Sequence, residues 1–213
     1  MCGKKLIMIG MMLIAILSSC GDRKELAPCL VEPGCEPPCW QQIIPGKSTF
    51  EDIKGQVPEI KGIDGDSIFI DEREILYDAC VRWDFIEDGQ VGEVCVFNQT
   101  ASFIALVGDF GLTLEKAISI YGEPDQFVYS RQAVGDPVAL RVVLFYLEKG
   151  LVISFKQSDL DTITLEPENK IDYILFYDLA LYPEIIIRLI VEEKDLEEHK
   201  MEWLGYVDIP IRN

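Results

Sequence analysis

The residues of this chain with the widest chemical repertoire are its seven cysteines, because a thiol can form disulfides, bind metals or carry a covalent group. They are Cys2, Cys20, Cys29, Cys35, Cys39, Cys80 and Cys95. The group from Cys29 to Cys39 lacks the Cys-x2-Cys spacing of zinc sites, and the chain has one histidine. We therefore expect disulfides among the later cysteines, and no metal or other cofactor.

Cys20 follows a segment that is typical of an export signal. Lys4 and Lys5 precede an apolar stretch, and the small residues Ser18 and Ser19 follow it. The stretch of about 14 residues is shorter than the roughly 20 that a membrane-spanning helix needs. We predict that residues 1–19 are a signal peptide.

The sequence Leu17-Ser18-Ser19-Cys20 resembles the lipobox of bacterial lipoproteins. The resemblance implies lipidation of the Cys20 thiol, cleavage just before Cys20, and attachment to a cell membrane on its extracytoplasmic face. A cleaved signal followed by a chance cysteine is the alternative. Acyl chains such as palmitate would hold the protein firmly, because each buried CH₂ contributes about 0.8 kcal/mol and several chains act together.

The chain is strongly acidic once the leader is set aside. Residues 1–19 contain two of the 19 Lys and Arg residues and none of the 37 Asp and Glu residues, so residues 20–213 have a formal charge of -20. This charge argues against a nucleic-acid partner, which requires a basic face. It also disfavours adsorption to an anionic bilayer, so the lipid must provide the attachment.

The five cysteines after Cys20 are an odd number, so at least one thiol stays free or pairs outside the chain. Export would permit disulfides. We predict one bridge within the group Cys29, Cys35 and Cys39, and one that involves Cys80 and Cys95.

The sequence offers no convincing catalytic set, so we expect a protein that is not an enzyme. Gly46-Lys47-Ser48 matches the end of a phosphate-binding loop, but Gln41 stands where that pattern needs glycine, and a helix cap is the better interpretation. His199 lies among charged residues, which predicts a solvated helical face. Paired carboxylates are too numerous in so acidic a chain to identify a site.

The chain divides into a tether, two similar units and a tail. Residues 20–39 are rich in Pro and Cys, and proline donates no N–H, so we predict a tether. Residues 40–100 form the first unit. Its helix is expected to begin at a capping box of Ser48 and Glu51 and to end at Pro58.

A hairpin is predicted to follow that helix. Apolar residues alternate up to Phe85, Asp88-Gly89 is a turn signal, and a return strand spans 91–97. If Glu87 pairs with Gln90, Trp83 lies opposite Val94. Cys80 and Cys95 are then diagonal to one another on the opposite face of the hairpin.

Residues 101–158 form the second unit. The stretch 111–118 is similar to 46–53, and Gly122-Glu123-Pro124 closes its helix. Strands are expected within 126–134, 140–147 and 151–157. In the tail, 159–213, we expect a strand within 163–177 and a C-terminal helix from Pro183 to Trp203. A buried strand over 185–191 is the alternative, because β-branched residues are dense there.

The expected fold class is α+β, with two similar helix-plus-antiparallel-meander units and a C-terminal helix. Over residues 40–157 this pattern resembles two protein groups: the SmpA/OmlA-type envelope lipoproteins and the tandem-repeat β-lactamase inhibitor protein. The resemblance implies a habit of binding other proteins. We therefore expect a membrane-anchored extracytoplasmic lipoprotein that binds another envelope or extracellular protein, or scaffolds the envelope. A surface lipoprotein that binds a small molecule or an ion is the alternative.

Overall fold

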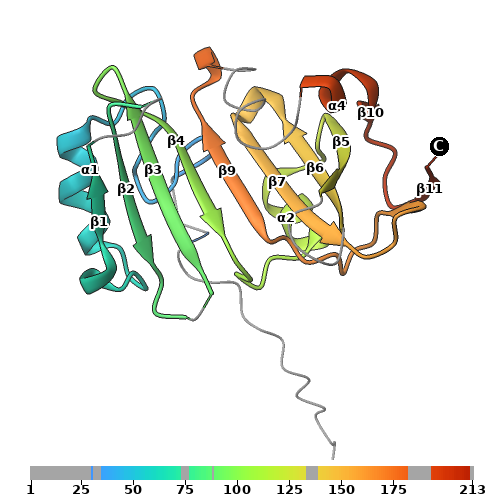
Figure 1. Ribbon diagram of the computed structural model, residues 1–213, viewed down its shortest axis with the longest axis horizontal. Helices are drawn as coiled ribbons and strands as arrows, with labels where there is room; N and C mark the ends of the chain where they lie inside the picture. Colours follow the sequence, from blue (N-terminus) through green and yellow to red (C-terminus); the bar gives the residue numbers. More distant parts are fainter. Residues whose placement is uncertain are drawn as a thin grey trace, which may run out of the picture.

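A computed structural model describes residues 30, 35–72, 77–87, 89–132, 139–181 and 193–211 of the protein. Its main element is a nine-stranded sheet with the order β1-β2-β3-β4-β9-β7-β6-β5-β10 (Figure 1). Every neighbouring pair is antiparallel. The strands are β1 Phe69–Asp71, β2 Ala79–Asp84, β3 Val91–Phe97, β4 Thr100–Val107, β5 Gln126–Gln132, β6 Ala139–Tyr146, β7 Leu151–Gln157, β9 Tyr173–Tyr177 and β10 Met201–Glu202. A separate two-stranded sheet pairs β8 Thr162–Thr164 with β11 Asp208–Pro210.

Two meanders of three consecutive strands make up most of the large sheet. One contains β2, β3 and β4, and the other contains β5, β6 and β7. Strand β9 lies between them and pairs with β4 on one side and β7 on the other. The meanders are therefore parts of one sheet rather than two separate sheets (Figure 1).

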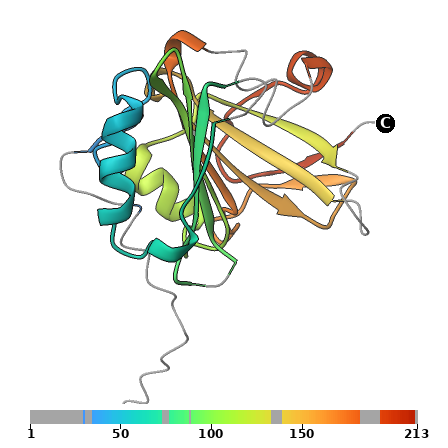
Figure 2. The same ribbon diagram turned by 60° about the vertical axis from the view of Figure 1, so that its left-hand side comes forward.

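The described helices are short. The α-helices are α1 Phe50–Gln56, α2 Leu114–Tyr121 and α4 Glu193–Glu198, and the 3-10 helices are η2 Val57–Glu59, η3 Gly65–Ser67, η4 Leu147–Lys149 and η5 Leu179–Leu181. Each of α1 and α2 precedes one meander, and both lie on the same face of the sheet (Figure 2). We call this the inner face and the opposite one the outer face. Ile53 of α1 and Ala117 of α2 are fully buried in the inner core.

The cap of α1 is shifted by one residue from the predicted capping box. The Thr49 hydroxyl accepts a hydrogen bond from the Asp52 N–H, and the Asp52 carboxylate accepts one from the Thr49 N–H. The Ser48 hydroxyl instead accepts a bond from the Ile44 N–H. Ser48 therefore stabilises the loop before the helix rather than the helix itself.

Both faces of the sheet are buried over its centre. The inner core contains Trp40, Trp83 and Phe155, and a second cluster on the outer face contains Phe103 and Phe145. Strands buried on both faces are apolar throughout and lose the period-two signal. This explains why β4, with the sequence TASFIALV, was not predicted as a strand.

The predicted fold class is wrong. The protein is β-rich, with a nine-stranded antiparallel sheet as its main element, rather than α+β with two units and a C-terminal helix. The run 185–191 lies outside the described residues. Beyond it, α4 has only six residues, and the chain then extends to pair with β5 as β10. Glu and Lys favour a helix there, but pairing with the sheet edge ends it.

The predicted register of the first hairpin is wrong by two residues. Trp83 lies opposite Gly92, and Val81 lies opposite Val94. The physical reason is the size of the indole, since a Cβ on Gly92 would approach the Trp83 ring to 2.3 Å. A shift of two keeps each side chain on its predicted face. Cys80 and Cys95 thereby become directly opposed instead of diagonal.

Candidate interaction surface

The predicted lipidation site and the domain are close in sequence. Residues 1–29, which include the predicted signal peptide, Cys20 and Cys29, lie outside the described residues. Leu30 is buried in the inner core, and the segment expected to be a tether belongs to the folded body from residue 35 onward. No described helix has the length and apolar character needed to cross a membrane.

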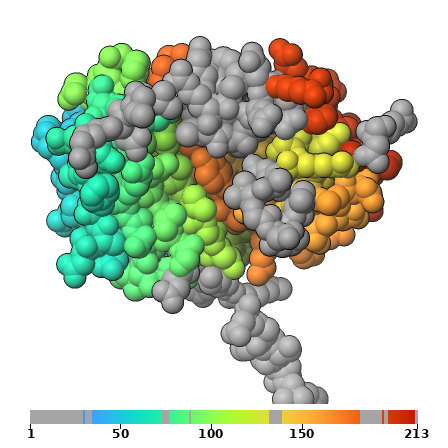
Figure 3. All heavy atoms as spheres, in the orientation of Figure 1, coloured from blue at the N-terminus to red at the C-terminus, as the bar shows by residue number. Residues whose placement is uncertain are grey.

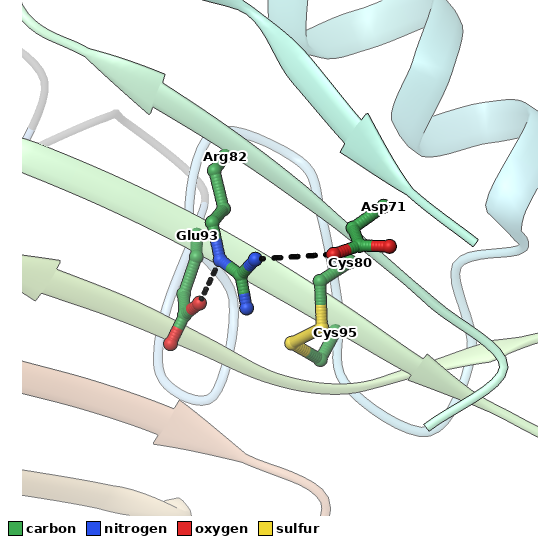
Figure 4. Close-up of a disulfide and its surroundings, with 5 residues drawn as sticks. All are labelled: Asp71, Cys80, Arg82, Glu93 and Cys95. Atoms are coloured by element: carbon green, nitrogen blue, oxygen red, sulfur yellow. Dashed lines mark hydrogen bonds and ion pairs between the residues drawn. A yellow bond between two sulfur atoms is a disulfide. The ribbon is translucent and has the colours of Figure 1, made fainter. Parts of the chain in front are cut away.

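Two disulfides are present, so the expectation of bridged cysteines is confirmed. Cys35 pairs with Cys39, with Cα atoms 5.2 Å apart. Cys80 pairs with Cys95 across β2 and β3, with Cα atoms 4.1 Å apart (Figure 4). Both cysteines of this bridge are buried on the outer face, where the disulfide links the neighbouring strands β2 and β3.

A charged cluster lies beside the Cys80–Cys95 bridge on the outer face (Figure 4). The Arg82 Nε atom is 3.0 Å from the Glu93 carboxylate, and Arg82 Nη1 is 3.9 Å from the Asp71 carboxylate. All three side chains remain partly exposed. Such pairs add at most about 1 kcal/mol to stability, but they restrain the Arg82 guanidinium between the two carboxylates.

A shallow hollow of about 400 Å³ lies next to this cluster, over β2, β3 and β4. Its lining includes the small side chain of Ala105, which lies between the longer side chains of Glu93 and Leu175 on the adjacent strands. Val91 and Val107 pair across β3 and β4 at its rim, and both are about 40% exposed. Figure 3 shows the outer face, with β1 to β4 in teal and green on its left side.

A second hollow, of about 570 Å³, surrounds the connection between β2 and β3. It shares Asp84 and Val91 with the first hollow, and these two residues are cross-strand partners. Ile86 lies in the second hollow and is 72% exposed. The two hollows therefore adjoin one another, with an acidic and an apolar side chain where they meet.

A second polar cluster occupies the other meander on the same face. Arg141 Nη1 lies 2.5 Å from the Ser154 hydroxyl and 3.2 Å from the Asp172 carboxylate. Its guanidinium carbon is 6.0 Å from the centre of the Tyr173 ring. Burial raises the pKa of Tyr173, Glu93 raises it further, and Arg141 opposes them. Tyr173 therefore stays a neutral phenol at physiological pH.

The other residues that the sequence singled out have structural roles. Gly46 donates its N–H to the Ala101 carbonyl, and a Cβ on Gly46 would lie 2.9 Å from the Asp178 carboxylate. A carboxylate so close would repel phosphate, so Gly46–Ser48 is no phosphate loop. His199 is not on a solvated face, because it is half-buried and stacks on Tyr129 with ring centres 4.5 Å apart.

Metal-binding clusters are absent from the part of the chain that the structure describes, where no three His, Cys, Asp or Glu side chains gather in a ligand-like group. The outer-face hollow was missed from the sequence because it depends on Ala105 of β4, a strand that was not predicted. An apolar residue, Val91, at the first position of the strand predicted over 91–97 was the signal in the sequence that could have pointed to this surface. Comparison of the chain with protein-family models, curated proteins and solved structures finds no match.

Proposed function

We propose that this protein is an extracytoplasmic lipoprotein, anchored by a lipid on Cys20, whose outer sheet face binds another protein. The observation that carries the proposal is the open hollow on β2 to β4. Exposed Val91 and Val107 line it, together with a salt-bridged arginine, Arg82. Phe69 on the edge strand β1 is opposite Arg82 and 53% exposed, which extends the apolar area.

The shape of this surface favours a protein partner over a small molecule. Small-molecule sites enclose most of their ligand within a concave pocket lined by convergent polar groups. Both hollows described above are instead open on one side, the first over strands β2 to β4 and the second at the connection between β2 and β3. Arginine and aromatic side chains are enriched where proteins bind proteins, and Arg82 and Phe69 lie opposite one another on this surface.

The proposed anchor would keep the domain near its membrane. Leu30 is buried and stands ten positions after Cys20, so a fully extended connection spans at most about 35 Å. The partner is therefore expected at the surface of the same membrane. The alternative lipoprotein function, binding of a small molecule or an ion, is less well supported, because neither of the two hollows is enclosed and the described residues include no metal-binding cluster.

Lipidation is tested by substituting the proposed anchor. Cys20→Ser is expected to leave an unprocessed or released chain without incorporated fatty acid, measured by metabolic labelling, mass spectrometry and membrane fractionation. Cys29→Ser is the matched control, and it should label and fractionate as the wild type does. Equal labelling of the Cys20→Ser chain would refute the anchor.

Protein binding is tested by crosslinking in the native host followed by mass spectrometry, with an unrelated lipoprotein as the control. We expect at least one envelope protein to be enriched on the domain, with crosslinked peptides that map to β2, β3 or β4. If nothing is enriched over the control lipoprotein, the binding proposal fails, whatever the result for Cys20.

A further inference from the structure

The surface that joins the two hollows has a definite chemical pattern. Asp84, Val91 and Val107 form a row across three adjacent strands, because Asp84 pairs with Val91 and Val91 pairs with Val107. Neighbouring strands are about 4.8 Å apart, so the row is about 10 Å long. Asp64 lies in the second hollow, at the acidic end of the row. We call Asp64, Asp84, Ile86, Val91 and Val107 the hairpin-end surface.

The acidic end of this surface lacks a counter-charge within the described part of the chain. The ion pairs found there include no cation for Asp64 or Asp84. Arg82, the cation that lines the first hollow, is held by Glu93 at 3.0 Å. A partner with basic side chains would therefore meet two exposed carboxylates, and one with acidic side chains would be repelled.

The apolar end is exposed to a degree that is costly in water. Val91, Val107 and Ile86 are 41%, 40% and 72% exposed, and they are contiguous with the open hollows. Covering them would remove apolar surface from water at about 25 cal/mol per Å². The surface can therefore bind one basic side chain at its acidic end and two aliphatic side chains at its apolar end.

We propose that the hairpin-end surface binds an extended segment of a partner protein with the pattern basic–x–aliphatic–x–aliphatic. In an extended chain, side chains two positions apart share a face and lie about 7 Å from one another, so the three side chains of the pattern span about 14 Å. Asp64 lies beside Asp84, since its N–H donates to the Asp84 carbonyl, and it extends the row of about 10 Å by one chain spacing to a similar length. The basic residue binds Asp84 and Asp64, and the aliphatic residues cover Val91 and Val107. This inference rests on the proposed protein-binding function and names the chemistry of the partner.

The first experiment measures the binding of defined peptides to the full lipidated chain in detergent micelles by fluorescence anisotropy. The three probes are Lys-Ser-Val-Ser-Val, Glu-Ser-Val-Ser-Val and Lys-Ser-Ser-Ser-Ser, each flanked by glycines and labelled. We expect the first probe to bind most tightly and its affinity to fall as salt is raised. Equal affinity for the first and either other probe would overturn the proposal.

Variants of the protein then locate the binding. Asp64→Asn with Asp84→Asn should weaken the first probe between about 2-fold and about 30-fold, the range for two exposed ion pairs. Val107→Ser should weaken it further. The matched set is Glu115→Gln with Glu123→Gln, and Ile120→Ser, whose side chain has the same exposed fraction as that of Val107. Equal losses in both sets would show non-specific attraction to an acidic protein and overturn the proposal.

A photo-crosslinking residue at position 107 or 120 in the native host tests the hairpin-end surface separately from the proposed protein-binding function. Capture of a basic–x–aliphatic–x–aliphatic segment at 107 and not at 120 supports the proposal. Capture of a protein only at 120 overturns the hairpin-end surface as the binding site, but it remains compatible with the proposed protein-binding function at another surface. Capture of lipid or of an acidic segment at 107 also overturns the hairpin-end surface. Capture at neither position, together with no enrichment of any partner, overturns both.

Discussion

The contact between Trp83 and Gly92 provides the sharpest test of the strand register. A Cβ on Gly92 would lie 2.3 Å from Trp83 Cε2 and 2.5 Å from Trp83 Nε1, where ordinary contact begins at 3.4 Å. The indole would have to retreat by about 1 Å. Trp40 blocks the retreat, because it stacks on Trp83 with ring centres 5.5 Å apart, and both rings are 2% exposed.

We therefore expect Gly92→Ala to lower the free energy of unfolding by about 3 kcal/mol, the upper end of the cost of overpacking a core. In urea this corresponds to a midpoint about 1.5 M lower for a domain of this size. The measurement is urea unfolding followed by tryptophan fluorescence. Near-ultraviolet circular dichroism should also change, because the stacked Trp40 and Trp83 rings shift relative to one another.

Gly55→Ala is the control for this substitution. Gly55 lies in α1 with no atom within 4 Å of its Cβ position, so alanine there should be neutral or stabilise by up to about 1 kcal/mol. Trp83→Leu in the Gly92→Ala background should cost less than the sum of the two single changes, because the smaller side chain removes the clash. A Gly92→Ala protein as stable as the wild type would refute both the packing and the register.

Further predictions concern the disulfides and the cap of α1. Replacing Cys80 and Cys95 with alanine should cost about 3 kcal/mol, and replacing Cys35 and Cys39 about 2 kcal/mol, because the Cys35–Cys39 bridge closes a loop of four residues and the Cys80–Cys95 bridge one of 15. Urea unfolding checks the order of the two costs, and non-reducing peptide mapping that finds other pairings would contradict the prediction. Thr49→Ala should cost about 1 kcal/mol through loss of the cap, measured by thermal unfolding against Thr100→Ala as a comparison. Hydrogen bonds from the Thr49 side chain and the Thr49 N–H lower the pKa of Asp52, so its carboxylate stabilises the fold above the unfolded-state pKa of about 4 and ceases to do so as pH falls through the folded-state pKa. Asp52→Asn should therefore be less stable than wild type at pH 7 and converge with it in acid, and a stability difference that is constant with pH would contradict this.

The sequence predicted those elements whose signal is local. The strands at 91–97 and 151–157 have the bounds expected, because alternation and turn residues define them directly. The disulfide between Cys80 and Cys95 was predicted because alternation places both cysteines on the same face of the hairpin. A register error of two residues does not change the face on which a side chain lies. The register itself depended on whether Val94 or Gly92 leaves room for the Trp83 indole, a contact that no turn signal encodes.

Features that depend on distant parts of the chain escaped prediction. Strand β4 is apolar on both faces, because the inner core covers one face and the outer cluster the other, and its sequence therefore lacks periodicity. The hollow on the outer face requires Ala105 to lie between Glu93 and Leu175, which are far apart in sequence. The half-buried position of His199 likewise requires Tyr129 from another strand.

The place of β9 in the sheet determines the order in which the protein can become complete. Until Tyr173–Tyr177 have left the ribosome, β4 and β7 each present an unpaired edge of the kind that pairs with other chains. The insertion of β9 closes both edges in one step and makes the two meanders a single cooperative unit. A chain that ends before residue 173 is thus expected to aggregate rather than persist as two independent halves, although each half has its own helix and meander.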